Sequence, residues 1–337
     1  MQARHGLCTE LYFGAEENIS RAASSEIRAI DERLMLAEKL TEECDNNENV
    51  DPKINLVGFA SNTNSGDKKF ENKNLIKFNS YEELIQSNKI DAIYISTLNN
   101  THKGLVELAA KNKKKILCEK PLGLNYNEVI DVSKALENQN DTFFEAITYR
   151  AHPQTSILKE VLSNKEIDKI KKIDSNFGFK IKRINKDSRL FKKEFGGGSI
   201  LDLGCYPISF FNLFSNKENE MKILNIKKDY CETNVDVDAK INLKLNENIE
   251  AFAHVSFKEN LRNICKIYCD NATIIVPEPW IPSKSNFIEV QSKSRYYKKM
   301  ISSNKDCYTI QLNNVSDVFM GQNSSKKYLI DIKESLQ

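Results

Sequence analysis

The sequence lacks the features that mark a nucleic-acid-binding or membrane-spanning protein. Its 49 Lys and Arg residues are balanced by 47 Asp and Glu residues, so the formal net charge is only +2. Such a balance produces no strong positive field to attract nucleic acid or an anionic membrane surface. No window approaches the roughly 18 consecutive apolar residues of a membrane-spanning helix. A small molecule is therefore the expected partner.

The eight cysteines lack the close CxxC pairs that a structural zinc site requires, and we expect no bound metal. Several of them fall in apolar, strand-like runs, where a thiol behaves as a small hydrophobic side chain. The N-terminus also lacks the apolar core of a signal peptide. A reducing, cytoplasmic location is therefore expected.

The length and the pattern of apolar residues predict two domains, residues 1–148 and 149–337. After an amphipathic helix over residues 19–40, short apolar runs alternate with helical patterns, as in a parallel sheet covered by crossover helices. Strands are expected at 54–60, 92–97, 115–118 and 142–146, and helices at 80–86, 102–112 and 125–136.

The pattern changes beyond about residue 150. Helices are expected at 153–162 and 201–213, with strand-like segments at 170–179, 221–227, 239–245, 249–257, 264–269 and 273–276. Several of these segments alternate polar and apolar residues, which indicates an antiparallel sheet with one face wet or available to a partner. The fold class is thus α/β, with a parallel sheet followed by a large, mostly antiparallel open sheet.

Polar residues follow three strands of the first domain, where ligands of open α/β sheets bind. They lie at 61–63, 96–102 and 118–121. The first could equally form an ordinary turn. In the third, Pro121 biases Lys120 towards an extended backbone, which aims its ammonium group. In a partly desolvated cleft we expect the pKa of Lys120 to be lowered, so that it can polarise an oxygen or shuttle a proton. The alternative is a lysine that extends into solvent.

Four segments carry a resemblance to a known family. They are residues 96–102 (STLNNTH), 119–122 (EKPL), 145–154 (EAITYRAHPQ) and 196–207 (GGGSILDLGCYP). In this order and spacing they resemble the glucose-fructose oxidoreductase/inositol dehydrogenase family, called Gfo/Idh/MocA, and within it the dihydrodiol dehydrogenase-like branch.

The resemblance implies an N-terminal Rossmann-type domain that binds NAD(H) or NADP(H), and a C-terminal α/β domain that supplies the substrate wall and a homodimer or higher homo-oligomer interface. It implies an NAD(P)-dependent oxidoreductase acting on a sugar, a polyol or a cyclic alcohol. The implied catalytic residues are Lys120, Tyr206 and Asp202. The implied cofactor-binding residues are Ser61, Asn62, Thr97, Asn99, His102, Glu119 and Lys120, and the candidate substrate-binding residues are Arg150, His152 and Arg189.

The implied catalytic residues form a coherent chemical set. Hydride transfer creates or removes charge on an alkoxide oxygen, which requires a proton donor or acceptor and a nearby positive charge. Tyr206 beside Lys120 could supply both, and Asp202 lies one helical turn before Tyr206 on the same face. The alternatives are a core tyrosine, a carboxylate favoured by a helix N-terminus and, for His152, a solvated loop histidine.

The first strand and its turn depart from the family pattern. A Rossmann domain should open with G-x-G-x-x-G, whose second glycine admits the pyrophosphate. The closest stretch, residues 11–20, places Glu16 at that position, where a carboxylate would crowd and repel the phosphates. The second strand ends without the acidic residue that binds the ribose of NAD, and Lys68 and Lys69 follow, which favours NADP.

The last segment also departs, because the family normally adds an element that returns to the first domain after a segment like residues 308–319. The sequence ends at Gln337, so we expect this element to be missing. These departures leave two alternatives open: a catalytically silent relative that acts as a sensor or scaffold, and a lyase or hydrolase that uses a tightly held nicotinamide transiently.

Overall fold

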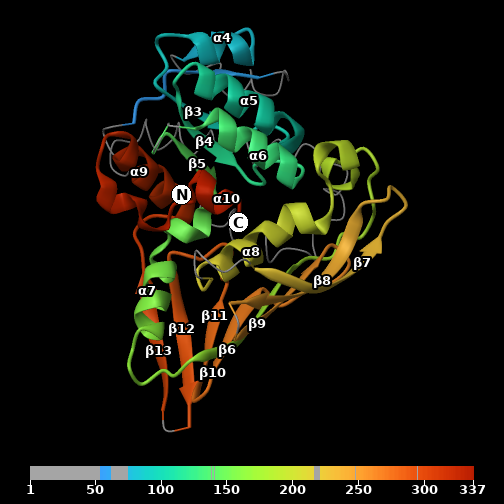
Figure 1. Ribbon diagram of the computed structural model, residues 1–337, viewed down its shortest axis with the longest axis vertical. Coiled ribbons are helices and arrows are strands. Elements are labelled where there is room, and N and C mark those ends of the chain that lie inside the picture. The colour runs from blue at the N-terminus through green and yellow to red at the C-terminus, as the bar shows by residue number, and fades with distance from the viewer. Residues whose placement is uncertain are drawn as a thin grey trace, which may run out of the picture.

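The computed structural model describes residues 54–61, 75–137, 139, 141–215, 221–246, 248–293 and 295–337. Parallel strands with their helices lie at one end of the molecule and a large sheet at the other (Figure 1). The expected helix at residues 19–40, Glu16 and Asn62 lie outside the described residues. Among the described residues, no helix has the length and apolar character needed to cross a bilayer.

The first part confirms the predicted alternation of parallel strands and helices. Strand β1 (Gly58–Ala60) pairs in parallel with β2 (Ile76–Phe78), which was not predicted. A second parallel sheet has the order β3 (Ala92–Ile95), β4 (Lys115–Glu119) and β5 (Phe143–Ala146). The helices are α4 (Tyr81–Gln86), α5 (Asn99–Lys111) and α6 (Tyr126–Ala135).

Local sequence explains where these elements begin. The Ser80 hydroxyl accepts a hydrogen bond of 3.0 Å from the Glu83 amide at the start of α4, and Asn125 caps α6 in the same way. Such side chains satisfy amides that have no partner within the helix. In β4, Ile116 and Cys118 on one face and Leu117 on the other are all buried, as expected for a parallel strand covered on both faces.

The second part contains an eight-stranded sheet with the order β13-β12-β11-β10-β6-β9-β8-β7. Neighbours are antiparallel except for the interior pair β6 and β9, which is parallel. The sequence predicted six of these strands but neither β12 nor β13. The bounds are β6 (Ile170–Gly178), β7 (Lys222–Tyr230), β8 (Asp236–Leu245), β9 (Ile249–Ser256), β10 (Ile264–Cys269), β11 (Ala272–Pro277), β12 (Ser285–Ser292) and β13 (Tyr296–Ser302).

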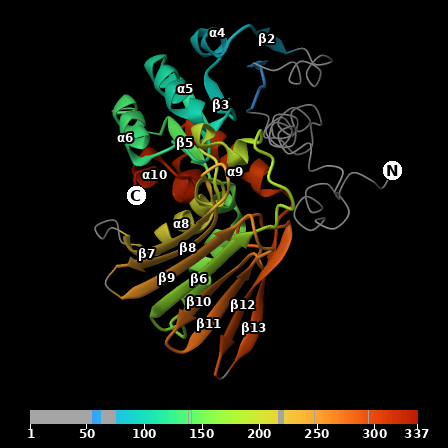
Figure 2. The same ribbon diagram turned by 90° about the vertical axis from the view of Figure 1, so that its right-hand side faces the viewer.

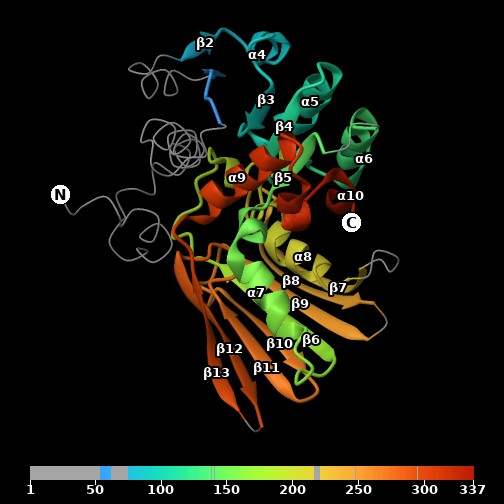
Figure 3. The same cartoon turned by 90° about the vertical axis from the view of Figure 1, so that its left-hand side faces the viewer.

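Helices cover one face of this sheet. Both α7 (Pro153–Leu162) and α8 (Cys205–Asn212) lie on it (Figure 3), whereas no described helix covers the opposite face (Figure 2). Strand β8 alternates accordingly, since Ala239 and Ile241 are buried while Lys240 and Lys244 are exposed. The predicted open sheet is confirmed.

The last segment returns to the first sheet, so the expectation that such an element is missing was wrong. After α9 (Cys307–Phe319) and a 3₁₀ helix (Asn323–Tyr328), a backbone bridge joins Ile330 to Glu145, and α10 (Ile332–Ser335) follows. Side chains of α9 pack against Leu117 and Phe144 in one apolar cluster. The segment was overlooked because its apolar residues complete a core whose other half lies far away in sequence. The division between residues 148 and 149 stays a prediction.

Candidate active site

Lys120 is the first residue after β4, and its side chain reaches the second part of the molecule. Its Nζ donates a hydrogen bond of 2.8 Å to the main-chain oxygen of Asp202 and lies 3.6 Å from Asp202 Oδ1. The same Nζ lies 4.9 Å from the ring centroid of Tyr206. The structure therefore brings together all three predicted catalytic residues.

The charge state of Lys120 differs from the expectation. Burial lowers its pKa, as the sequence argument supposed, but the carboxylate of Asp202 raises it, and the net pKa lies above the ordinary value. The prediction of a lowered pKa was wrong because it considered desolvation without the carboxylate that a distant segment supplies. In the structure Lys120 is a cation held in place.

Asp202 and Tyr206 lie on a helix that begins with a π turn. The π turn (Ile200–Gly204) runs directly into α8, and such wide turns often occur at functional sites. Asp236 holds its start, since Oδ2 accepts hydrogen bonds from the Ser199 hydroxyl at 2.7 Å and the Ile200 amide at 2.8 Å. The wide turn thus places the Asp202 carbonyl and carboxylate on the side that faces Lys120.

Arg189 adds a second cation to the same carboxylate. It begins a 3₁₀ helix (Arg189–Phe191), and its Nη1 and Nη2 each lie 3.2 Å from Asp202 Oδ1. Its Nε is buried and has no hydrogen-bond partner among the described residues. A buried donor of this kind is costly unless a ligand or water satisfies it, so Arg189 offers a binding group at the site.

Tyr206 is part of an aromatic cluster as well as a neighbour of Lys120. Its ring packs edge-on against Phe177 at 5.3 Å and lies 6.2 Å from Tyr149 and 6.5 Å from Trp280, measured between ring centroids. The side chain is buried. By its packing, Tyr206 is therefore a core tyrosine. The contact of its ring with the Lys120 ammonium also places it at the candidate site.

The predicted cofactor loop lies at the end of β3. Thr97 Oγ1 is 2.6 Å from Thr101 Oγ1, and Asn99 begins α5. His102 is fully buried, with Nδ1 2.8 Å from the Pro121 oxygen and Nε2 3.1 Å from the Thr97 oxygen. It therefore joins the loop after β3 to the turn that follows Lys120.

The glycine turn meets this loop. Gly196 has φ 69°, and a Cβ there would lie 2.6 Å from Leu124 Cδ2 and 3.2 Å from Asn99 Nδ2, which both belong to the first part. The absence of a side chain at Gly196 therefore lets this backbone approach Leu124 and Asn99 closely. The candidate site lies where the two parts meet.

Arg150 and His152 occupy buried protein contacts rather than the Lys120 group. Arg150 binds Ser209 and Glu334. His152 caps α7 by accepting a hydrogen bond from the Gln154 amide at 3.1 Å, and burial lowers its pKa to about 4. The solvated-loop interpretation of His152 was wrong, because only 1% of the residue is exposed.

Three positions that support the site were not singled out from the sequence. Tyr94 donates its hydroxyl to the Glu119 carboxylate, Glu145 accepts from the amide of Leu122, and Asp236 holds the π turn. A signal existed for Tyr94 and Glu119, which both lie near the ends of adjacent parallel strands. Glu145 opens one of the four motifs, but its partner could not be inferred from the motif.

Comparison with known proteins identifies the family. Residues 35–147 match the model described as "Oxidoreductase family, NAD-binding Rossmann fold", and residues 156–275 match the "GFO/IDH/MocA C-terminal domain". The chain is 31% identical over 245 residues to trans-1,2-dihydrobenzene-1,2-diol dehydrogenase of Xenopus tropicalis, covering 72% of each protein. The chain belongs to the GFO/IDH/MocA oxidoreductase family. The branch inferred from the four motifs is thereby confirmed, as is the prediction of an NAD(P)-dependent oxidoreductase that acts on CH–OH groups.

Other GFO/IDH/MocA relatives agree in fold and class. The chain is 35% identical over 137 residues to D-xylose 1-dehydrogenase (NADP(+)) 2 of Haloferax volcanii, covering 41% of this chain and 42% of that protein. The structure matches KijD10, a 3-ketoreductase from Actinomadura kijaniata solved with NADP and TDP-benzene, with a TM-score of 0.73 at 16% identity over 85% of this chain and 88% of that one. The predicted α/β fold class is confirmed.

The described residues fit a nicotinamide dinucleotide. The ends of two adjacent parallel strands carry the Thr97 hydroxyl, the Glu119 carboxylate and the Lys120 ammonium. The buried Nε of Arg189 adds a donor that no described residue satisfies. This set of donors and acceptors suits a polar ligand placed across the strand ends.

Proposed function

We propose that this GFO/IDH/MocA member catalyses reversible oxidation of a ring-borne secondary hydroxyl in a cyclic diol or a sugar, with NADP(H) as the preferred cofactor. The observation that carries the proposal is Lys120, whose ammonium is held by Asp202 beside Tyr206. The named activities of the relatives, on a dihydrobenzenediol and on D-xylose, support this substrate class.

The proposed cofactor contacts come from the strand ends of the first part. Ser61 follows β1, Thr97 and Asn99 follow β3, and Glu119 ends β4. The bound nicotinamide would accept or supply the hydride. His102 acts in this scheme by holding the Thr97 and Pro121 backbone rather than by touching the cofactor.

The protein supplies charge and proton transfer in this proposal. Asp202 raises the pKa of Lys120, so at neutral pH the lysine is a cation that stabilises negative charge on the substrate oxygen. Tyr206 gives or takes the hydroxyl proton. Arg189 shares the Asp202 carboxylate, and its Nε serves as a donor to a second oxygen of the substrate. A diol or sugar supplies such an oxygen beside the reacting one.

Replacement of the lysine tests this assignment. Lys120→Ala should lower kcat by about 10³-fold while leaving the fold intact, because the charge acts mainly on the transition state. Activity is measured as NADPH formation with cyclic diols and with aldoses. Lys134→Ala, on the exposed face of α6, is the matched control and should behave as the unmodified protein. A Lys120→Ala protein with full turnover would remove the lysine from the mechanism.

Cofactor binding separates the enzyme from the silent alternative. Titration with NADPH and NADH should give saturable fluorescence changes at micromolar concentration, with tighter binding of NADPH. Failure of both nucleotides to bind favours the sensor or scaffold. Bound cofactor without net oxidation of any substrate would instead point to the lyase or hydrolase.

The open face of the large sheet supports the expected homo-oligomer interface. Exposed apolar side chains lie on its two edge strands, at Leu224 and Tyr230 on β7 and at Tyr296 and Met300 on β13. We propose that this sheet packs against a second copy, which sedimentation of the purified protein tests: a monomer at micromolar concentration contradicts it. Four described cysteines, Cys205, Cys231, Cys265 and Cys269, form no disulfide, in keeping with the proposed cytoplasmic location.

A further inference from the structure

Helix α10 contacts residues that lead to both halves of the candidate site. It sits beside β5 and α6 on one side and near α8 on the other (Figure 1). Lys120 follows β4 in the first part, whereas Asp202 and Tyr206 belong to the helix of the second part. Two consecutive residues of α10 contact neighbours of these halves: Ser335 binds Glu145, and Glu334 binds Arg150.

Ser335 reaches the turn that carries Lys120. Its hydroxyl donates a hydrogen bond of 2.6 Å to Glu145 Oε2, and Glu145 Oε1 accepts one of 3.0 Å from the Leu122 amide. Glu145 is also fixed through its backbone, since its amide donates to the Ile330 oxygen at 2.9 Å. The carboxylate is buried, so these bonds are made away from water. Ser335 is therefore linked through the Glu145 carboxylate to Leu122, two residues beyond Lys120.

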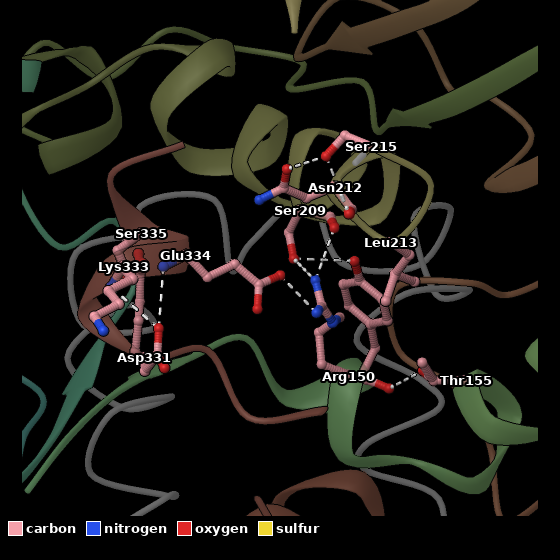
Figure 4. A network of polar contacts seen from close by, with 12 residues as sticks. Arg150, Thr155, Ser209, Asn212, Leu213, Ser215, Asp331, Lys333, Glu334 and Ser335 are labelled. Atoms are coloured by element: carbon pink, nitrogen blue, oxygen red, sulfur yellow. Dashed lines mark hydrogen bonds and ion pairs between the residues drawn. The ribbon is translucent and has the colours of Figure 1, made fainter. Parts of the chain in front are cut away.

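Glu334 reaches the helix that carries Tyr206. Its Oε1 forms an ion pair of 2.6 Å with Arg150 Nη2, and Arg150 Nη1 donates to the Ser209 oxygen at 2.8 Å and to its hydroxyl at 3.1 Å (Figure 4). Ser209 lies one helical turn after Tyr206. The Tyr149 hydroxyl adds a bond of 3.2 Å to the Tyr206 oxygen. Only 5% of the Arg150 side chain is exposed, so the fork of its guanidinium is held in one geometry.

We propose that α10 is a clasp that positions Lys120 against Asp202 and Tyr206, with Glu145 and Arg150 as the positioning residues through which it acts. The inference rests on the proposed function of Lys120, but the contacts themselves do not. Catalysis is sensitive to placement, because a displacement of about 1 Å can cost on the order of 10²-fold in rate. Loss of either contact, Ser335 with Glu145 or Glu334 with Arg150, should therefore lower kcat more than it weakens binding of cofactor and substrate.

Four variants test the clasp. Ser335→Ala removes the contact with Glu145 and Glu334→Ala removes the contact with Arg150, and each should lower kcat on the order of tenfold with the KM for cofactor and substrate within about twofold. Glu145→Gln, which keeps an acceptor for Leu122, should retain more activity than Glu145→Ala. The neighbouring Lys333 is exposed, and Lys333→Ala should match the unmodified protein.

A second readout does not depend on turnover. The rate at which an amine-reactive reagent modifies Lys120, followed by mass spectrometry, should rise severalfold in Ser335→Ala and Glu334→Ala and stay constant in Lys333→Ala. Unchanged labelling and unchanged kcat in folded protein would overturn the clasp. If the unmodified protein turns over no substrate, or Lys120→Ala stays active, the proposed function fails while the labelling result still decides the clasp.

Discussion

Lys120 and Asp202 face each other across the candidate site, but the chain positions them by different means. Lys120 follows a parallel strand whose register with β3 and β5 is regular. Asp202 lies in a π turn whose start depends on Asp236, a residue of the large sheet. The position of Lys120 thus follows from the regular hydrogen bonds of a parallel sheet. The position of Asp202 follows from an irregular helical turn that Asp236 stabilises.

Removal of the Asp202 charge should have the largest effect of the changes that probe this contrast. Asp202→Asn keeps the main-chain oxygen that binds Lys120 but removes the charge that raises the lysine pKa. We expect kcat to fall by about 10³-fold, and the pH limb due to Lys120 to move to lower pH, because the cation loses its stabilising partner. The measurement is kcat/KM against pH. Glu119→Gln, on the strand side, should shift this limb less, since Glu119 contributes less to the lysine pKa than Asp202 does. Equal shifts would contradict the unequal roles of the two sides.

His152, where the chain passes from one part to the other, should make stability depend on pH. Its folded pKa of about 4 lies below the ordinary value of 6.5. Its contribution is therefore present above pH 6.5 and is lost as the pH falls towards 4, because the unfolded chain takes up the proton first. Urea unfolding at pH 7.5 and 4.5 should show an extra loss of about 2–3 kcal/mol relative to His152→Asn, in which asparagine can still cap α7. The same loss in both proteins would mean that other groups dominate.

Glycine substitutions should give the smallest difference between the Lys120 side and the Asp202 side of the site, measured as unfolding free energy. Gly198 has φ 116°, and a Cβ would lie 2.5 Å from Asp236 Oδ1. Gly198→Ala should cost about 2 kcal/mol of unfolding free energy through backbone strain and displacement of Asp236. Gly104 lies within α5 with open space around it, and Gly104→Ala should add about 0.5–1 kcal/mol. Thermal or urea unfolding measures both, and destabilisation by both would erase the distinction.

The predictable part of the fold is the part with a regular sequence pattern. Helices α4 and α7 and strand β10 match their predicted ranges closely, because caps and apolar spacing mark their ends. Strands β12 and β13 were not predicted, since β13 lies at the sheet edge with most of its side chains exposed and lacks a long apolar run. The returning segment with α9 and α10 needs the first sheet to complete its core.

The sequence predicted which residues form the candidate site but not how they are arranged. The four motifs contain Lys120, Asp202 and Tyr206, and the structure brings these residues together. The pKa direction of Lys120 could not be inferred, because it depends on a carboxylate that lies 3.6 Å away in space but 82 residues along the chain. Arg150 and Arg189 were equivalent as sequence candidates. Only their partners in the structure distinguish them. Arg150 joins α8 to α10, whereas Arg189 shares the Asp202 carboxylate with Lys120.

The position of β6 inside the large sheet has a consequence for the order in which the chain can fold during synthesis. Strand β6 is made first, yet Ile173 pairs with Ala251 on one side and with Ile267 on the other. Until those residues leave the ribosome, both edges of β6 lack their partners. Sheets that depend on such distant pairings form slowly and expose edges that favour aggregation. The nascent chain should therefore need protection by a chaperone over this interval.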